Sequence, residues 1–209
     1  MRLKREVARR VFAKEFNASR FKIGGEVERE PVYLLTPLGL KCNRIFIVGA
    51  LLEKEETRSE EVLRIRVADP TGSFLGFVGK FDPEARDSLA EIDVPSTVAV
   101  TAKAKLLERD EKVTPFIRPE SIVATDFETR DYWILETAKA TLKRIELMNS
   151  ENELAKLAKE KYNTKVEEYK EMVILALQKL KEETEISETT EEDFDDSIEE
   201  EIMGLNDIY

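Results

Sequence analysis

The sequence contains no histidine and only one cysteine, Cys42. Histidine is the commonest general base, a frequent metal ligand and the usual partner of a nucleophilic Ser or Cys, so its absence removes those kinds of catalysis. A single cysteine excludes an internal disulfide framework and a cysteine-based zinc site. The sequence therefore predicts a protein that is not an enzyme and that holds no cofactor or metal.

Long apolar runs and amide side chains are also scarce. No apolar run reaches about 18 residues, and the first residues, MRLKREVARRVFAKEF, lack the apolar core of a secretory signal. We therefore expect a cytoplasmic, nucleoid-associated protein that does not contact a membrane. Asn and Gln together number only 7, whereas Lys, Arg and Glu abound, which favours a heat-adapted organism.

Charge is distributed unevenly along the 209 residues. The net charge of −11 comes from the end of the chain, because residues 1–150 hold 26 basic and 25 acidic side chains and residues 151–209 hold 7 and 19. The first 25 residues, by contrast, contain 8 basic and 2 acidic side chains. A chain with a basic start and an acidic end is typical of proteins with nucleic-acid or charged partners.

Residues 1–30 are predicted to form a basic N-terminal helix or arm. One helical face over 3–16 would carry the apolar side chains Leu3, Val7, Ala8, Val11, Phe12 and Phe16. Two interpretations remain open: a docking helix with solvated charges, or an arm that contacts phosphates.

Residues 31–126 have the pattern of short strands. Strands are predicted over 45–52, 62–68, 73–81, 96–108 and 113–123, with a short helix over 82–92 between the third and the fourth. Five short strands with a helix at this place predict an OB-fold, a small Greek-key β-barrel. Gly49 is expected at a bend, and Gly76 and Gly79 at points of tight curvature, although a surface kept open for flat ligands is an alternative.

Outward positions of these strands supply a candidate DNA-binding surface. Basic side chains that follow phosphates, together with aromatic rings on which bases stack, are what an OB barrel needs for binding a single strand. The candidates for this role are Arg64, Arg66, Phe74, Lys80, Lys103, Lys105, Phe116 and Arg118.

After the barrel the apolar spacing becomes that of helices. Residues 127–150 are predicted to form one helix that buries an apolar stripe against its own barrel or against a partner's helix. The residues assigned to this assembly surface are Trp133, Ile134, Ala138, Thr141, Leu142, Ile145 and Met148. Residues 151–183 are predicted to extend the chain by two further helices, as a hairpin or an oligomerisation arm.

Residues 184–209 are predicted to be an acidic, mostly disordered tail, since 13 acidic and no basic residues follow Lys181. Four apolar side chains within it are spaced four, four and three residues apart: Phe194, Ile198, Ile202 and Leu205. A solubilising tail is one interpretation, and a motif that binds a basic replication or repair protein is the other.

Five sequence blocks together resemble the archaeal replication protein A family, and most closely its small OB-fold subunits and associated proteins. The blocks are REVARRVFAKEFNAS, YLLTPLGLKCNRIFIVG, RVADPTGSFLGFVG, VPSTVAVTAKA and RDYWILETAKATLKRIELM, which cover about residues 5–149. The resemblance implies a protein that binds single-stranded DNA in replication, repair and recombination. It also implies a hetero-oligomer, such as a heterotrimer, joined through the helix over 130–149, with the turn DPTG linking the second and third barrel strands.

Two other classes of function remain as alternatives. The first is an assembly or recruitment subunit whose barrel does not contact DNA. The second is a carboxylate-metal nuclease that uses Asp69 and Asp82, although a turn and a helix cap already account for both carboxylates.

Overall fold

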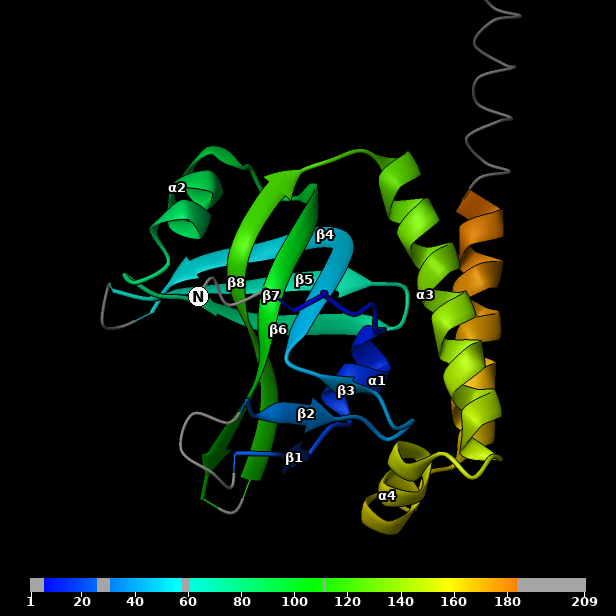
Figure 1. The fold of residues 1–209 in the computed structure, drawn as a ribbon. Helices are drawn as coiled ribbons and strands as arrows, with labels where there is room; N and C mark the ends of the chain where they lie inside the picture. The colour runs from blue at the N-terminus through cyan, green and yellow to red at the C-terminus, as the bar shows by residue number, and fades with distance from the viewer. Residues whose placement is uncertain (1–5, 26–30, 58–60, 111, 184–209) are drawn as a thin grey trace, which may run out of the picture.

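A closed barrel of five strands lies at the centre of the computed structural model, which describes residues 6–25, 31–57, 61–110 and 112–183 (Figure 1). The strands follow one another around the barrel in the order β4-β5-β6-β8-β7. Their bounds are β4 Arg44–Glu56, β5 Leu63–Asp69, β6 Gly72–Val78, β7 Ser96–Arg109 and β8 Lys112–Ala124, with helix α2 (Pro83–Glu91) between β6 and β7. The predicted OB-fold barrel is confirmed, and each predicted strand overlaps its observed counterpart.

Alternation along the strands separates the core from the surface. On β7 the side chains of Val98, Val100 and Ala102 are fully buried, whereas Lys103 and Lys105, which follow them, point outward. The same alternation on β5 buries Ile65 and Val67 and turns Arg64 and Arg66 to the outside. Since successive side chains of a strand lie on opposite faces, the sequence alone determines which cations face solvent.

Two of the three glycines are explained by close approach of strands. A Cβ on Gly76 would lie 2.6 Å from Ile65 Cγ1 and 3.0 Å from Ile117 Cγ1, at the point where β6 meets β8. A Cβ on Gly49 would lie 2.1 Å from the carbonyl oxygen of Ala68, where β4 turns from β7 towards β5. Gly79 is different, because it follows the end of β6 and a Cβ there would only come within 3.9 Å of Asp82. The curvature explanation is therefore wrong for Gly79.

The N-terminal helix predicted over 3–16 is wrong in its described part. Residues 6–12 are extended, and only α1 (Ala13–Asn17) is helical. Arg9 forms a parallel bridge with Ile45, its N–H donating to Arg44 O (2.8 Å) and its carbonyl accepting from Phe46 N (2.9 Å). The first part of β4 pairs with β7 along one edge, and its pairing with β5 begins only at Ala50. The other edge is therefore open there, and hydrogen bonds to it hold the segment extended.

A second, smaller sheet lies beside the far end of β7 and β8 (Figure 1). Its strands are β1 (Phe21–Ile23), β2 (Tyr33–Leu35) and β3 (Lys41–Cys42), all antiparallel. An ion pair of 2.6 Å between Lys22 and Glu108 joins it to the β7–β8 hairpin. The stretch 31–43, assigned above to the barrel, thus supplies β2 and β3 of this small sheet, and the barrel strands begin at Arg44.

Helix α3 (Phe127–Met148) and the helix over 166–183 run side by side along the barrel, joined at one end by the 2.6 Å ion pair of Arg130 with Glu183 (Figure 1). The short helix α4 (Glu153–Lys161) connects them. Trp133 Nε1 donates to Phe46 O (2.8 Å), and the ring of Phe12 meets Trp133 edge-on at 5.8 Å. None of these described helices is long and apolar enough to cross a membrane.

The predicted assembly surface of α3 is therefore mostly occupied by the chain itself. Only Leu142, 41 % exposed, is open to a partner. Trp133 contacts Phe12 and the carbonyl oxygen of Phe46, and Ile134 lines a cavity together with Leu180 of the helix over 166–183. The assignment to a partner's helix is wrong for the six residues buried in this way: Trp133, Ile134, Ala138, Thr141, Ile145 and Met148.

A buried ion pair lies beneath the same helix. Arg144 Nη2 donates to Glu15 Oε2 (2.7 Å) and to Thr141 Oγ1 (2.9 Å), while Thr36 Oγ1 donates to Glu15 Oε1 (2.7 Å). Glu15 is fully buried and Arg144 is 8 % exposed. This cluster ties α1 to α3 and to the loop after β2. The tail over 184–209, with Phe194, Ile198, Ile202 and Leu205, lies outside the described residues.

Candidate nucleic-acid interface

Two aromatic rings meet on the outer surface of the barrel. Phe77 on β6 and Phe116 on β8 are 5.6 Å apart between ring centroids, at an angle of 72°. Both are partly exposed, on either side of the single bridge between Gly76 and Ile117 that closes the barrel. A pair of partly exposed rings on a curved sheet offers surface on which unpaired bases can stack.

Strand pairing places a cation at each end of this ring pair. Arg64 on β5 lies opposite Phe77, and Lys105 on β7 lies opposite Phe116. The row Arg64, Phe77, Phe116 and Lys105 thus crosses four adjacent strands, and we name it the aromatic face. Directly opposite residues lie about 5 Å apart, so the row has the length of a few nucleotides.

Most cations around the aromatic face already have an acidic partner. Arg64 and Arg66 bind Glu55 and Glu53, the latter at 2.9 Å. The remaining pairs are Lys80 with Glu61 (3.2 Å), Arg118 with Asp82 (3.6 Å) and Lys103 with Glu120 (4.0 Å). A phosphate that approaches these side chains has to compete with a carboxylate.

Lys105 differs from the other cations of this surface. Within the described part of the chain it forms no ion pair. Partial burial, together with the charges of Arg118, Lys103 and Lys22, lowers its pKa from the usual value. A lysine surrounded by other cations marks the most positive point of the aromatic face, and it is the side chain best placed to take a phosphate.

One predicted DNA-binding residue is wrong. Phe74 is fully buried, and its ring packs at 5.4 Å against Phe16, so no base can reach it. Phe77, which the sequence analysis did not select, takes the outward place three residues later. Since Gly76 and Val78 alternate inward with Phe74, the strand pattern itself contained the signal for Phe77.

Another exposed ring lies past the end of β6. Phe81 is 84 % exposed, and the ammonium group of Lys80 lies 5.6 Å from its ring centre. A large apolar side chain this exposed is uncommon in a monomer and extends the available aromatic surface beyond Phe77. Sequence reasoning missed Phe81 because it had assigned the residue to the strand.

The two carboxylates of the nuclease alternative do not lie together in a metal-binding arrangement. Asp69 accepts hydrogen bonds from the N–H groups of Ala13 (2.6 Å), Thr71 (2.7 Å) and Gly72 (3.1 Å), while Asp82 faces Arg118. Among the described residues, no group of three His, Cys, Asp or Glu side chains could hold a metal ion. Asp69 thus stabilises the β5–β6 turn, and it accepts a hydrogen bond from the first residue of α1.

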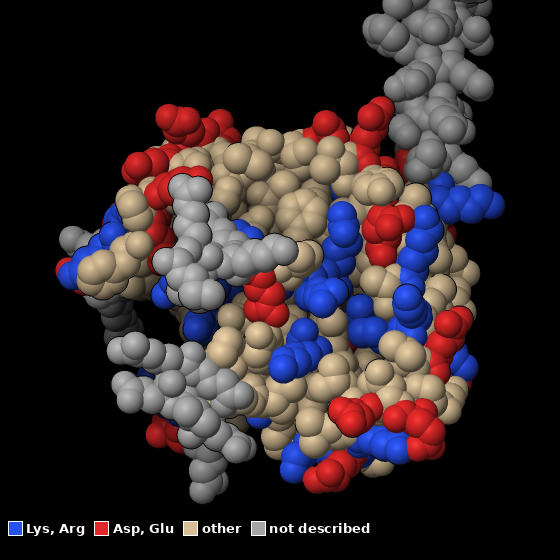
Figure 2. Space-filling view, in the orientation of Figure 1, with Lys and Arg blue, Asp and Glu red and all other residues tan. Residues whose placement is uncertain are grey.

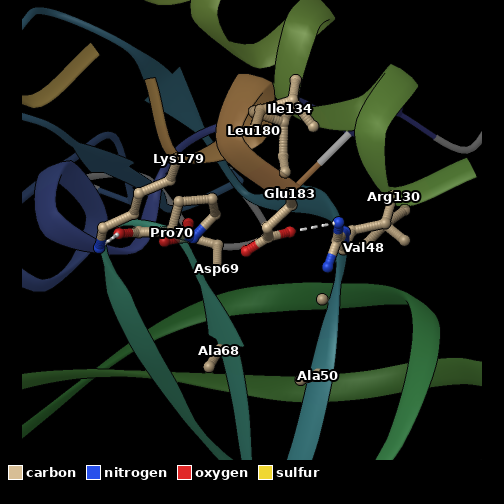
Figure 3. A pocket seen from close by; sticks show the side chains of 11 residues that line it. Val48, Ala50, Ala68, Asp69, Pro70, Arg130, Ile134, Lys179, Leu180 and Glu183 are labelled. Atoms are coloured by element: carbon tan, nitrogen blue, oxygen red, sulfur yellow. Dashed lines mark hydrogen bonds and ion pairs between the residues drawn. The ribbon is translucent and has the colours of Figure 1, made fainter. Parts of the chain in front are cut away.

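Asp69 also borders a cavity between the barrel and the two long helices (Figure 3). The cavity has a volume of about 240 Å³, and its helical wall carries Arg130, Lys179 and Glu183. These polar groups are bonded to their surroundings, Arg130 to Glu183 and Lys179 Nζ to the carbonyl oxygen of Pro70 (3.0 Å). Burial raises the pKa of Asp69 to about 6, against the opposing effect of the hydrogen bonds that it accepts. We attribute the polar groups of this cavity to packing of the helices on the barrel.

No protein-family model matches the sequence, and neither does any curated protein. Among solved structures, a chain of a replication protein A heterotrimer bound to ssDNA is similar over 66 % of this chain and 98 % of its own length, with 14 % identity and a TM-score of 0.47. The mitochondrial single-stranded DNA binding protein Rim1 of S. cerevisiae is similar over 41 % and 95 %, with 24 % identity and a TM-score of 0.33.

A third similar structure is the OBody AM2EP06 bound to hen egg-white lysozyme, at 14 % identity and a TM-score of 0.33, over 41 % of this chain and 82 % of that one. The fold assignment rests on the strand order of the barrel rather than on these likenesses. Because a barrel of this kind hosts many functions, the function has to be argued from its surface.

Proposed function

We propose that this chain binds single-stranded DNA on the aromatic face, as a non-enzymatic subunit or associate of a replication protein A complex. The role in replication, repair and recombination, the archaeal origin and the place near the nucleoid follow from the sequence resemblance. The surface chemistry supports the binding role on its own.

One observation carries the proposal: two partly exposed rings in contact on adjacent strands, with Arg64 at one end and Lys105 at the other. The two rings and the cations that flank them span a distance that fits a few nucleotides. Stacking ignores base identity, so the site is expected to bind single strands with little sequence preference.

The carboxylates around the aromatic face set the expected strength of binding. Each of Arg64, Arg66, Lys80 and Arg118 exchanges a carboxylate for a phosphate when DNA binds, and the exchange yields little net energy. We therefore expect moderate affinity with a shallow salt dependence, since few counterions are released. A chain with this moderate affinity would add to the DNA binding of a larger subunit rather than replace it.

Fluorescence anisotropy of a labelled oligo-dT with the full chain tests the proposal. Replacing both rings, F77A/F116A, should weaken binding by about ten-fold or more, since one stacked base contributes about 1–3 kcal/mol. The matched control is F127A, because Phe127 is 66 % exposed at the start of α3, away from the aromatic face. Equal affinities of F77A/F116A and F127A would contradict the proposal.

A second candidate function is assembly without DNA contact. It is favoured by the large apolar side chains left exposed on the two long helices: Leu135 (43 %), Leu142 (41 %), Ile174 (54 %) and Leu175 (57 %). Sedimentation equilibrium of the wild type, alone and with oligo-dT, against the variant L135K/L142K, distinguishes the two. Self-association abolished by the variant, with no DNA binding by either protein, would favour the assembly role.

A further inference from the structure

A second positively charged surface lies away from the aromatic face, between the N-terminal segment and α3. It is a groove of about 540 Å³, bordered on one side by residues 7–10 and on the other by α3 residues from Glu136 to Leu147. We name it the basic groove. In Figure 2 the blue side chains gather in the part of this face where the N-terminal segment runs towards α3.

The cations of the basic groove are less neutralised than those of the aromatic face. Five cations line it, Arg9, Arg10, Lys139, Lys143 and Arg144, against one carboxylate, Glu136. Glu136 forms an ion pair with Lys139 at 2.7 Å, and Arg144 forms one with the buried Glu15. Within the described residues, Arg9, Arg10 and Lys143 form no side-chain ion pair.

Two arginines of the groove also have unused hydrogen-bond donors. Three buried side-chain nitrogen atoms lack a partner among the described residues, and two of them are the Nε atoms of Arg10 and Arg144. Arg144 is 8 % exposed, and Arg10 is held 5.5 Å from the ring centre of Phe46. Buried donors without acceptors cost free energy, and both of these atoms belong to side chains that line the groove.

Apolar side chains lie between the cations of the basic groove, and they indicate which kind of anionic ligand it can bind. Val7 is 73 % exposed and Leu147 is 38 % exposed, and Ala8, Leu40 and Ala140 also line the groove. The lining includes no aromatic residue, so bases have nothing to stack on. A groove that is both cationic and aliphatic suits an acidic peptide with regularly spaced apolar side chains.

The same chain contains such a peptide in the part that the structure does not describe. Residues 191–202 carry eight acidic and no basic side chains, and Phe194, Ile198, Ile202 and Leu205 recur at helical spacing. We propose that residues 191–205 bind in the basic groove of their own chain. The proposal does not depend on DNA binding by the aromatic face.

The length of chain between the helix over 166–183 and this peptide permits binding within one molecule. Glu183 contacts Arg130 near the start of α3, and Lys143 lies about 20 Å further along that helix at 1.5 Å per residue. The 11 residues from Glu183 to Phe194 can span about 36 Å when extended. The connecting segment is therefore longer than the distance that it has to span.

Photo-crosslinking in the full chain tests the proposal. Phe194 is replaced by benzoylphenylalanine, and crosslinked peptides are identified by mass spectrometry after irradiation. We expect crosslinks to residues 7–10 or 139–147 in a product of monomer mass. Charge reversal by K139E/K143E should lower their yield by about ten-fold, and added salt should lower it further.

The matched control is K156E/K159E, which makes the same charge change at exposed positions of α4 and should leave the yield unchanged. Crosslinks to the aromatic face, or a yield insensitive to K139E/K143E, would overturn the proposal. A product of twice the monomer mass would also overturn it, because the peptide would then bind a second copy of the chain.

Discussion

The aromatic face and the basic groove both carry cations, but they differ in the side chains that accompany those cations. The aromatic face lies on strands of a closed barrel, and it has rings at its centre and cations that are mostly paired with carboxylates. The basic groove lies between an extended segment and a helix, and it has unpaired cations and aliphatic side chains. Positive charge alone would select the groove as the DNA site, whereas the position of the rings selects the barrel.

The two surfaces differ in whether they only attract anions or can also recognise the bases of a nucleic acid. Unpaired cations attract any anion, whether it is a phosphate or a carboxylate, while exposed rings also offer flat faces on which bases can stack. We therefore assign DNA to the surface with fewer free charges. The following predictions perturb one region at a time.

The largest effect is expected from Glu15→Ala, which removes the carboxylate behind the basic groove. Arg144 would remain buried without its counter-charge, and Thr36 would lose an acceptor, so the free energy of unfolding should fall by about 3–5 kcal/mol. Urea unfolding followed by circular dichroism measures the loss. The control, Glu136→Ala, removes a partly exposed carboxylate from the groove rim and should change stability little. Similar losses for both variants would contradict a buried pair.

Asp69 gives the next largest effect, as a dependence on pH. Its pKa is raised by burial to about 6, from 3.8, so between these values the folded state holds a proton that the unfolded chain has released. Stability then falls as pH rises. Relative to D69N, which does not titrate, the wild type should lose about 3 kcal/mol of unfolding free energy between pH 3.5 and 7.

Urea midpoints of the wild type and D69N at four pH values across this range provide the measurement. A difference between the two proteins that stays constant, or that grows in favour of the wild type as pH rises, would show that the hydrogen bonds to Asp69 outweigh its burial.

Gly76→Ala should strain the barrel beneath the aromatic face. The new Cβ would come within 3.0 Å of both Ile65 and Ile117, an overpacking that typically costs about 1–3 kcal/mol. Gly79→Ala, where the nearest atom is 3.9 Å away, serves as the control and should leave thermal stability nearly unchanged. Equal melting temperatures for the two variants would count against close strand contact at Gly76.

The smallest effect concerns Lys105, which forms no ion pair with any residue that the structure describes. Lys105→Ala should weaken oligo-dT binding by a few-fold at low salt and reduce the slope of log K against log salt by about 0.7, the value of one phosphate contact on a single strand. Lys80→Ala removes a lysine already bound to Glu61 and should change the slope less. Anisotropy titrations at four salt concentrations compare the two slopes, and a larger change for Lys80→Ala would contradict the account.

The barrel could be predicted because alternation and turn residues are local signals. Ile65, Val67 and Val100 are buried for the same reason that Arg64 and Lys103 are not, and neither fact needs a distant partner. The packing around α3 could not be predicted in this way. An apolar stripe on a helix can pack against many surfaces. Only the folded structure shows that the N-terminal segment and the helix over 166–183 of the same chain pack against α3.

The candidate site was predicted in part. Outward cations such as Arg64 and Lys105 followed from strand period, but Phe74 was selected although the alternation of β6 buries it together with Gly76 and Val78 and turns Phe77 outward. The basic groove was missed because a helical period over 3–16 concealed an extended segment. That segment is held by hydrogen bonds to Arg44 and Phe46, more than thirty residues away in sequence.

The most direct test of the DNA assignment is photo-crosslinking of the full chain to an oligo-dT that carries 5-iododeoxyuridine, with the modified peptides identified by mass spectrometry. We expect crosslinks at Phe77 or Phe116 that disappear in F77A/F116A. Crosslinks confined to residues 7–10 and 136–147 would contradict it, because the single strand would then follow the unpaired cations of the basic groove.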